Sequence, residues 1–308
     1  MQVVATIIPI FGVVLLGLFA RRKGFMPQEF LAPANQLVYY LAIPAMIFRA
    51  ISKASFRTEF NVRVLLITLS SALAAYMAAW IIGRRTRWQP GRIGTFIQCS
   101  AHGNQGYIGL PIAFYFIGQS GLAKAGILAG FLMVLQNTLS VLALQTFAVT
   151  GEGSGRKIRF VAENLIRNPI IVSALTGVTI SVFQIPIPFT IDRFLEVLGG
   201  LAPPMSLLLI GASLSLQVMR RNFLPVLGSV IIKIIALPVL GLTVFTLFRV
   251  SAVDYLPGLI LLAAPTATVA YVMAREMHGD EEFAVAAIST STVCSAATYL
   301  IWLTLVGT

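Results

Sequence analysis

A polar, glycine-rich stretch interrupts an apolar segment of the sequence at residues 99–118. It contains Asn104, Gln105 and Pro111 together with four glycines. In lipid, backbone groups freed by a broken helix are tolerated only where they are buried in protein or line a cavity. The N-terminus of a half-helix presents unpaired N–H groups and a partial positive charge, and an asparagine amide can add a donor beside it. The stretch therefore predicts a site that binds an anion without a full positive charge.

A second break is expected about half a chain later, at residues 261–277. Here Pro265 stands among small residues inside another apolar run. We expect both segments to be broken helices whose halves meet near the middle of the membrane and cross. In the first break, Gly103, Gly106 and Gly109 would let backbone and substrate approach closely. The alternative is a glycine-rich packing face with a proline kink, which does not explain a matching break in the second half.

The composition predicts an all-helical membrane protein. Of the 308 residues, 57% are hydrophobic and only 11% are charged, and the mean hydropathy is +0.88. Soluble domains carry roughly 25% charged residues, and a membrane-spanning helix needs about 20 mostly apolar ones. Charge clusters and Gly or Pro residues separate ten such segments. The predicted spans are 3–21, 35–52, 62–83, 93–118, 122–148, 167–184, 194–218, 223–248, 255–277 and 282–306.

The chain resembles itself at an offset of about half its length. An offset of 160 residues aligns Pro9 with Pro169, and an offset of 161 aligns Asn104 with Pro265, so the two breaks are equivalent in the repeat. Five spans per repeat is an odd number, so the second copy enters the membrane from the opposite side and the repeat is inverted. The predicted parts are a first five-helix repeat at 1–149, a cytoplasmic joint at 150–166 and a second five-helix repeat at 167–308.

The net charge of +11 lies in short basic clusters between the spans, which favours an orientation signal over a nucleic-acid surface. If the N-terminus is outside, 14 Lys and Arg residues fall in inward loops and 7 in outward ones. The positive-inside rule therefore predicts a multi-pass protein of the cell (inner) membrane with both termini outside the cytoplasm. The first span lacks a basic n-region and a cleavage site, so we expect it to be retained in the lipid bilayer.

Four short motifs of the chain belong together: NQGYIGLP at 104–111, LIRNP at 165–169, LAIP at 41–44 and APTATVAYVMAREM at 264–277. They resemble the auxin efflux carrier family, and the resemblance runs over nearly the whole chain. The family includes plant auxin carriers and bacterial permeases for malonate or other carboxylates. The resemblance implies a fold like that of the bile-acid symporters and the NhaA antiporter. It also implies an elevator-like division, with spans 1, 2, 6 and 7 as a scaffold that forms homodimers and spans 3–5 and 8–10 as a mobile transport unit.

The resemblance also implies roles for individual residues. Asn104 matches the asparagine at the family's crossover, which contacts the substrate carboxylate, and Pro265 matches the crossover proline of the second repeat. Asn168 lies in the family's Arg-Asn-Pro motif. The chain departs from the plant carriers at Ile47, where they have a polar residue, and it lacks their long central loop. Both differences favour a cargo smaller than auxin.

Two titratable residues near the breaks are candidates for coupling transport to protons. Lys233 lies about ten residues into its span, too deep for its ammonium to reach either interface easily, and such a charge is a functional candidate. It either caps carbonyl groups freed at the crossover, in place of a bound sodium ion, or takes part in proton coupling. His102, two residues before Asn104, either titrates as a coupling group or is a neutral, hydrogen-bonded helix histidine.

The sequence argues against an enzyme, a cofactor and a metal site. The two histidines stand 176 positions apart, which is not a metal-ligand spacing, and no nucleophile is paired with a base. The GNQGYIG segment lacks the Lys and Ser/Thr of a phosphate-binding loop. The absence of buried acidic pairs also disfavours a sodium/proton antiporter.

The combined prediction is a secondary transporter that moves a small organic anion, such as a carboxylate, by alternating access. Two alternatives stay open: a sodium-coupled symporter of the same superfamily, for which the acid-poor core offers few ligands, and a membrane receptor that kept the fold without transporting. The predicted substrate-binding residues are Asn104, Gln105, Gly106, Asn168, Pro265 and Thr266. The predicted structural residues of the crossover are Gly103, Gly109, Pro111 and Lys233.

Overall fold

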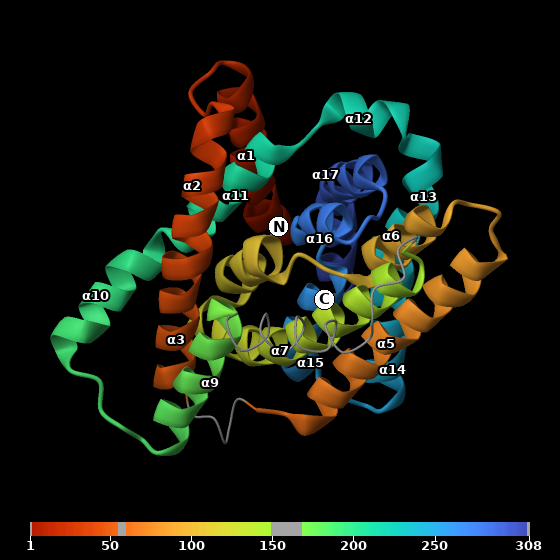
Figure 1. The fold of residues 1–308 in the computed structure, drawn as a ribbon. Helices are drawn as coiled ribbons and strands as arrows, with labels where there is room; N and C mark the ends of the chain where they lie inside the picture. Colours follow the sequence, from red (N-terminus) through yellow and green to blue (C-terminus); the bar gives the residue numbers. More distant parts are fainter. Residues whose placement is uncertain (1, 55–59, 149–167, 307–308) are drawn as a thin grey trace. The chain divides into compact units, whose positions relative to one another are not determined.

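The computed structural model describes residues 2–54, 60–148 and 168–306, and these are almost entirely helical (Figure 1). No β-strand occurs within these ranges, where an isolated antiparallel bridge pairs Gly103 with Thr266. The all-helical class predicted from composition is therefore confirmed. The predicted joint at 150–166 lies outside the described residues.

The described chain divides into two compact units, and each combines segments from both predicted repeats. The first unit contains almost all of the predicted spans 1, 2, 6 and 7. The second unit contains almost all of spans 3, 8, 9 and 10, and spans 4 and 5 are divided between the units. Their roles as scaffold and transport parts stay a prediction. The first unit comprises residues 2–54, 60–62, 105–131 and 168–214, and the second comprises 63–104, 132–148 and 215–306.

The first unit is built from long apolar helices and two short π turns. A π turn joins α2 and α3 into one continuous run from Gln28 to Lys53 (Figure 1). Its elements are α1 (Gln2–Arg22), α2 (Gln28–Leu37), η1 (Val38–Ala42), α3 (Ile43–Lys53), η2 (Gln105–Gly109), the beginning of α7 (Leu110–Thr146), α9 (Pro169–Val182), α10 (Phe189–Gly200) and α11 (Ala202–Ser213).

Two glycines let α1 and α11 approach until their backbones touch. A Cβ atom on Gly17 would overlap the carbonyl oxygen of Leu208, and one on Gly211 would overlap that of Val14. Small residues at such contacts are typical of membrane helix pairs, where close van der Waals packing drives association. The pair α1–α11 is therefore one of the tightest helix contacts of the first unit.

The second unit contains the two interruptions of helix, at residues 102–104 and 264–268. Its elements are α5 (Val62–Arg85), α6 (Pro90–Ala101), the rest of α7, α12 (Leu216–Arg221), α13 (Phe223–Ile231), η3 (Ile232–Ala236), α14 (Leu237–Leu247), α15 (Ala252–Ala263), α16 (Val269–Glu276) and α17 (Glu281–Val306). An ion pair of 2.7 Å between Arg92 and Asp280 joins the beginnings of α6 and α17.

Each of the three π turns in the described part of the chain ends two residues before a proline. The prolines are Pro44 after η1, Pro111 after η2 and Pro238 after η3, and the helix continues through all three. A proline has no N–H group and its ring clashes with the carbonyl four residues before it. Widening the preceding turn moves that carbonyl away, so the helix is not broken. Pro111, predicted as part of the crossover, thus lies inside a continuous helical run.

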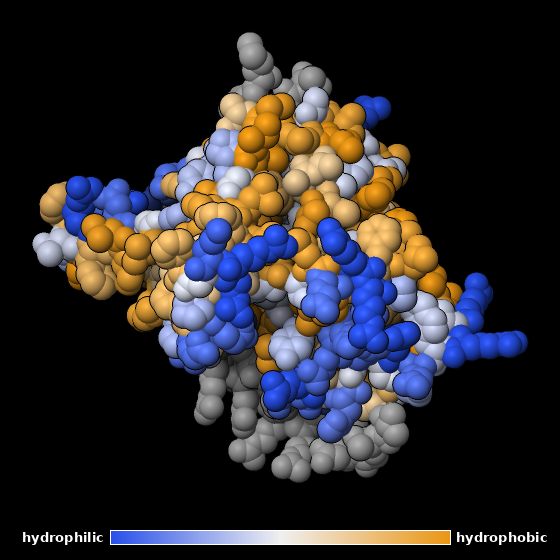
Figure 2. Space-filling view, turned by 90° about the horizontal axis from the view of Figure 1, so that it is seen from above, coloured by the Kyte–Doolittle hydropathy of each residue, from blue (hydrophilic) through white to orange (hydrophobic). Residues whose placement is uncertain are grey.

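Seven helices of the described chain are long and apolar enough to cross a membrane, and α9 and α15 are shorter apolar helices. The ten-span count and the inverted repeat stay predictions, because the breaks shorten some of the expected spans. Residues 105–146 form a run of two helices. That run bends at Gly118, whose φ of 84° and ψ of −161° suit only glycine. Broad hydrophobic areas are exposed on the face drawn in Figure 2, as expected for contact with lipid.

Candidate functional site

The helices α6 and α15 end where the sequence predicts breaks. After α6 ends at Ala101, the chain becomes helical again only at Gln105. After α15 ends at Ala263, helix resumes at Val269. Both segments contain proline, glycine or asparagine in an otherwise apolar sequence. The helix stops in each, and neither break forms an exposed loop.

In the second unit the two breaks lie side by side and pair like short antiparallel strands. The N–H of Asn104 donates to the carbonyl of Pro265 at 2.7 Å, and the N–H of Ala267 donates to the carbonyl of His102 at 2.9 Å. These bonds satisfy four backbone groups that a continuous helix would have paired internally. The predicted meeting of the two broken helices is therefore present in the structure.

Side chains satisfy three further backbone groups of the first break. The amide of Gln136, on α7, donates to the carbonyl of Ala101 at 2.9 Å and accepts from the N–H of Gly103 at 3.3 Å. The hydroxyl of Thr266 donates to the carbonyl of Cys99 at 3.0 Å, an acceptor that the N–H of Gly103 would reach in an unbroken helix. Gln136 and Thr266 are both fully buried.

Three residues from α17 and η3 bind backbone groups of the second break. Ser291, on α17, accepts from the N–H of Thr266 at 3.0 Å. Tyr299, also on α17, donates its hydroxyl proton to the carbonyl of Ile260 at 2.9 Å. Lys233, in η3, donates to the carbonyl of Leu262 at 2.7 Å and is fully buried. The contact that a structural role of Lys233 requires is thus present, while a part in proton coupling stays a prediction.

His102 stands at the end of a buried chain of hydrogen bonds. Its Nδ1 lies 3.0 Å from the hydroxyl of Ser140, which lies 2.7 Å from the hydroxyl of Tyr76. Tyr76 donates in turn to the backbone carbonyl of Gln136 at 3.1 Å. Because a carbonyl can only accept, Ser140 donates to Tyr76 and accepts from an Nδ1–H of His102. His102 is thus hydrogen-bonded inside the protein, while its protonation state and a coupling role for it stay predictions.

Comparison with known proteins identifies the family. The family model described as membrane transport protein, which is that of the auxin efflux carriers, matches residues 2–303. This chain belongs to the auxin efflux carrier family.

Relatives of this auxin efflux carrier family member match over nearly their full length. One is a protein of Rhizobium meliloti (strain 1021) provisionally named as a malonate transporter, 25% identical over 305 residues that cover 96% of this chain and 93% of the relative. Another is an uncharacterized transporter of Methanocaldococcus jannaschii, 23% identical over 296 residues that cover 94% of each chain.

The predicted site residues of this family member fall in both units. Asn104, Pro265 and Thr266 belong to the second unit, whereas Gln105, Gly106 and Asn168 belong to the first, so the unit boundary follows Asn104 directly. Gln105 and Gly106 begin η2, and Gly109 ends it; all three are buried. The amide nitrogen of Gln105 has no hydrogen-bond partner within the described residues.

Asn168 caps a helix in the first unit. Its side-chain oxygen accepts from the N–H groups of Ile170 and Ile171, at 3.0 and 3.3 Å, and Pro169 occupies the first position of α9. Asparagine at the cap and proline at the next position are favoured by the unpaired N–H groups of a helix start. Its predicted contact with substrate stays a prediction.

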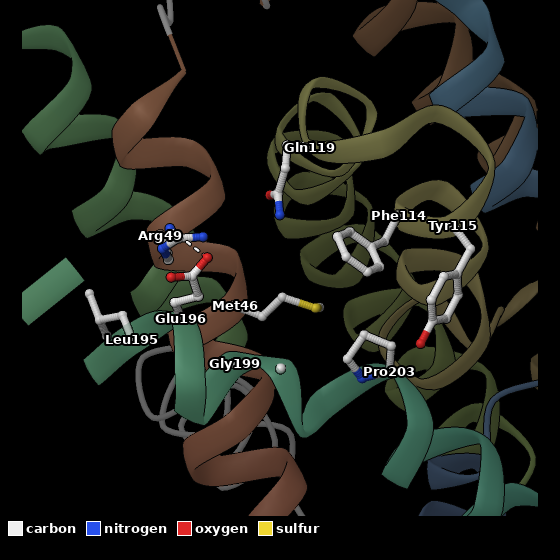
Figure 3. Close-up of a pocket in the computed structure, with 10 residues that line it drawn as sticks. Met46, Arg49, Phe114, Tyr115, Gln119, Leu195, Glu196, Gly199 and Pro203 are labelled. Atoms are coloured by element: carbon white, nitrogen blue, oxygen red, sulfur yellow. Dashed lines mark ion pairs between the residues drawn. The ribbon is translucent and has the colours of Figure 1, made fainter. Parts of the chain in front are cut away.

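The first unit contains a pocket of about 180 Å³ that the sequence did not predict. Met46 and Arg49 line it from α3, Phe114, Tyr115 and Gln119 from α7, and Glu196, Gly199 and Pro203 from α10 and α11 (Figure 3). At its edge, Arg49 binds Asp192 through two bonds of 2.8 and 3.2 Å and contacts Glu196 at 3.3 Å, and Lys53 binds Asp192 at 2.6 Å.

The signal for this charge cluster was present in the sequence. Arg49 and Lys53 are four residues apart, as are Asp192 and Glu196, so each pair lies on one face of its helix. Arg49 and Lys53 are two of the seven cations that the charge count places on the outward side of the membrane.

Proposed function

We propose that this family member is a secondary transporter that moves a small carboxylate across the membrane by alternating access, with the substrate bound at the paired breaks. The observation that carries the proposal is the antiparallel pairing of residues 102–104 with 265–267 inside one compact unit. Irregular backbone at membrane depth is expected only where it is buried in protein or lines a cavity. Discontinuous helices of this kind form the substrate sites of many secondary transporters.

The substrate class follows from the chemistry available at the breaks. Asn104 offers a neutral amide donor, and α16 begins beside the second break with no side chain capping its first N–H groups. Such a helix start carries a partial positive charge and favours an anion. A carboxylate fits these donors, and the name of the Rhizobium meliloti relative assigns that protein a dicarboxylate.

Alternating access requires two parts that move against each other. We propose that the second unit carries the substrate and that the first unit serves as the scaffold and forms the homodimer. The support is that the two units are separate compact bodies and that the paired breaks belong entirely to the second.

The test is a binding and transport experiment on the purified protein. We expect malonate and related carboxylates to raise the melting temperature, whereas malonamide, which has the same skeleton without charge, leaves it unchanged. In proteoliposomes, internal malonate should drive uptake of labelled malonate without a sodium gradient. Sodium-dependent uptake would favour the symporter alternative, and binding without counterflow would favour a receptor.

A further inference from the structure

The side-chain amide of Gln136 bridges the first break on both sides of His102. Its nitrogen donates to the carbonyl of Ala101, and its oxygen accepts from the N–H of Gly103. In a continuous helix these groups would pair with the N–H of residue 105 and the carbonyl of residue 99. One amide therefore replaces two helical hydrogen bonds at the point where the helix stops.

The position of Gln136 is itself fixed within the second unit. It lies in α7 and is fully buried, and its backbone carbonyl accepts the hydroxyl proton of Tyr76 from α5. Ordering a glutamine side chain costs conformational entropy. The hydrogen bonds of this buried amide offset that cost and hold the side chain in one geometry.

The bridge ends one residue before Asn104. The N–H of Gly103 is held by Gln136, and the N–H of Asn104 is held by the carbonyl of Pro265. The backbone leading into Asn104 is thus fixed from α7 on one side and from the second break on the other. The direction of the Asn104 side chain depends on both.

We propose that Gln136 is a positioning residue for substrate binding: it holds residues 101–103 in their non-helical form and so directs the amide of Asn104. This inference rests on the proposed function, in which Asn104 contacts the carboxylate. Gln136 is fully buried, and one donor and one acceptor of its amide bind backbone groups of the break, which is the contact pattern of a positioning residue.

The substitution Gln136→Glu tests the bridge because its chemistry depends on protonation. A protonated glutamic acid can still donate to Ala101 and accept from Gly103, whereas a carboxylate cannot donate and repels the Ala101 carbonyl. The control is Gln145→Glu, the same change on the same helix at a partly exposed position. Gln136→Met, of similar length but without hydrogen bonds, removes the bridge at every pH.

The readout is malonate counterflow in proteoliposomes between about pH 5 and pH 8. At each pH, the KM of a variant is divided by that of the wild type. We expect the KM of Gln136→Glu to be near the wild-type value at low pH and to rise about tenfold or more toward high pH, with the maximal rate less affected. Gln136→Met should show the raised KM throughout, and Gln145→Glu should follow the wild type. A Gln136→Glu profile parallel to the wild type, or a wild-type KM in Gln136→Met, would overturn the inference.

A second measurement separates this inference from the proposed function. If the wild type moves no malonate, the proposed substrate is wrong, and the bridge is then judged from melting temperatures without ligand. We expect the melting temperature of Gln136→Glu to fall more steeply with rising pH than that of Gln145→Glu. Equal slopes would show that Gln136 does not hold the break.

Discussion

Lys233 donates a hydrogen bond to the carbonyl oxygen of Leu262, 2.7 Å away, one residue before α15 ends. In an unbroken helix that carbonyl would accept from the N–H of Thr266, which instead donates to Ser291. The ammonium therefore replaces a helical hydrogen bond that the second break removes.

Lys233→Met should destabilise the protein by about 1–3 kcal/mol, because the Leu262 carbonyl is left buried without a donor. Lys233→Arg keeps the positive charge and the hydrogen-bond donors, so this variant should lose less stability. The melting temperatures of both variants check this, and counterflow at several pH values checks the coupling alternative. A Met variant that is stable and active but has lost its pH dependence would assign Lys233 to proton coupling, whereas one that also keeps its pH dependence would exclude both roles.

Asn104→Ala should weaken malonate binding by about 1–3 kcal/mol while the melting temperature without ligand stays near the wild-type value, since a charge-assisted hydrogen bond to the substrate is lost. The affinity can be measured from ligand-induced shifts in melting temperature. Asn137→Ala, the same change on α7, serves as the control and should bind normally. Unchanged transport kinetics in Asn104→Ala would remove this residue from the site.

Gly17→Ala should destabilise the first unit by about 1–3 kcal/mol, because the new methyl group overlaps the Leu208 carbonyl of α11. Gly12→Ala, on the same helix, is the matched control: no atom lies within 4 Å of a Cβ atom placed there. Thermal unfolding in detergent compares the two. Equal melting temperatures would mean that α1 and α11 can separate at no cost.

The membrane orientation can be checked by labelling a single cysteine in intact cells. The 14 to 7 charge distribution predicts that Ser154, in the joint outside the described residues, is cytoplasmic. Ser154→Cys should therefore resist an impermeant thiol reagent until the cells are opened. Rapid labelling from outside would reverse the topology and the order of the two repeats.

The sequence predicted the breaks because their signal is local. A proline, glycines and an asparagine inside apolar runs have few explanations in a membrane, so the ends of α6 and α15 could be placed within a few residues. Asn168 was more ambiguous, because an Asn-Pro pair fits a helix start as well as a binding site, and the helix start is what the structure shows.

Long-range partners such as Gln136, unlike Lys233, could not be predicted in the same way. Gln136 is 33 positions from Gly103, and Asp192 is 143 positions from Arg49. A single buried glutamine has many possible partners, and which one it meets depends on the packing of whole helices. The π turns were also missed, because a proline in an apolar run predicts a kink more readily than a widened turn.

The close contact of α1 with α11 has a consequence for biosynthesis. Ala202, where α11 begins, follows the end of α1 at Arg22 by 180 residues. At ordinary rates of translation, α1 emerges on the order of ten to forty seconds before its partner. During that interval its glycine face lacks the helix against which it packs in the folded protein. A ribosome pause or a truncation before residue 202 should therefore leave α1 open to quality-control proteases, although α1 itself is intact.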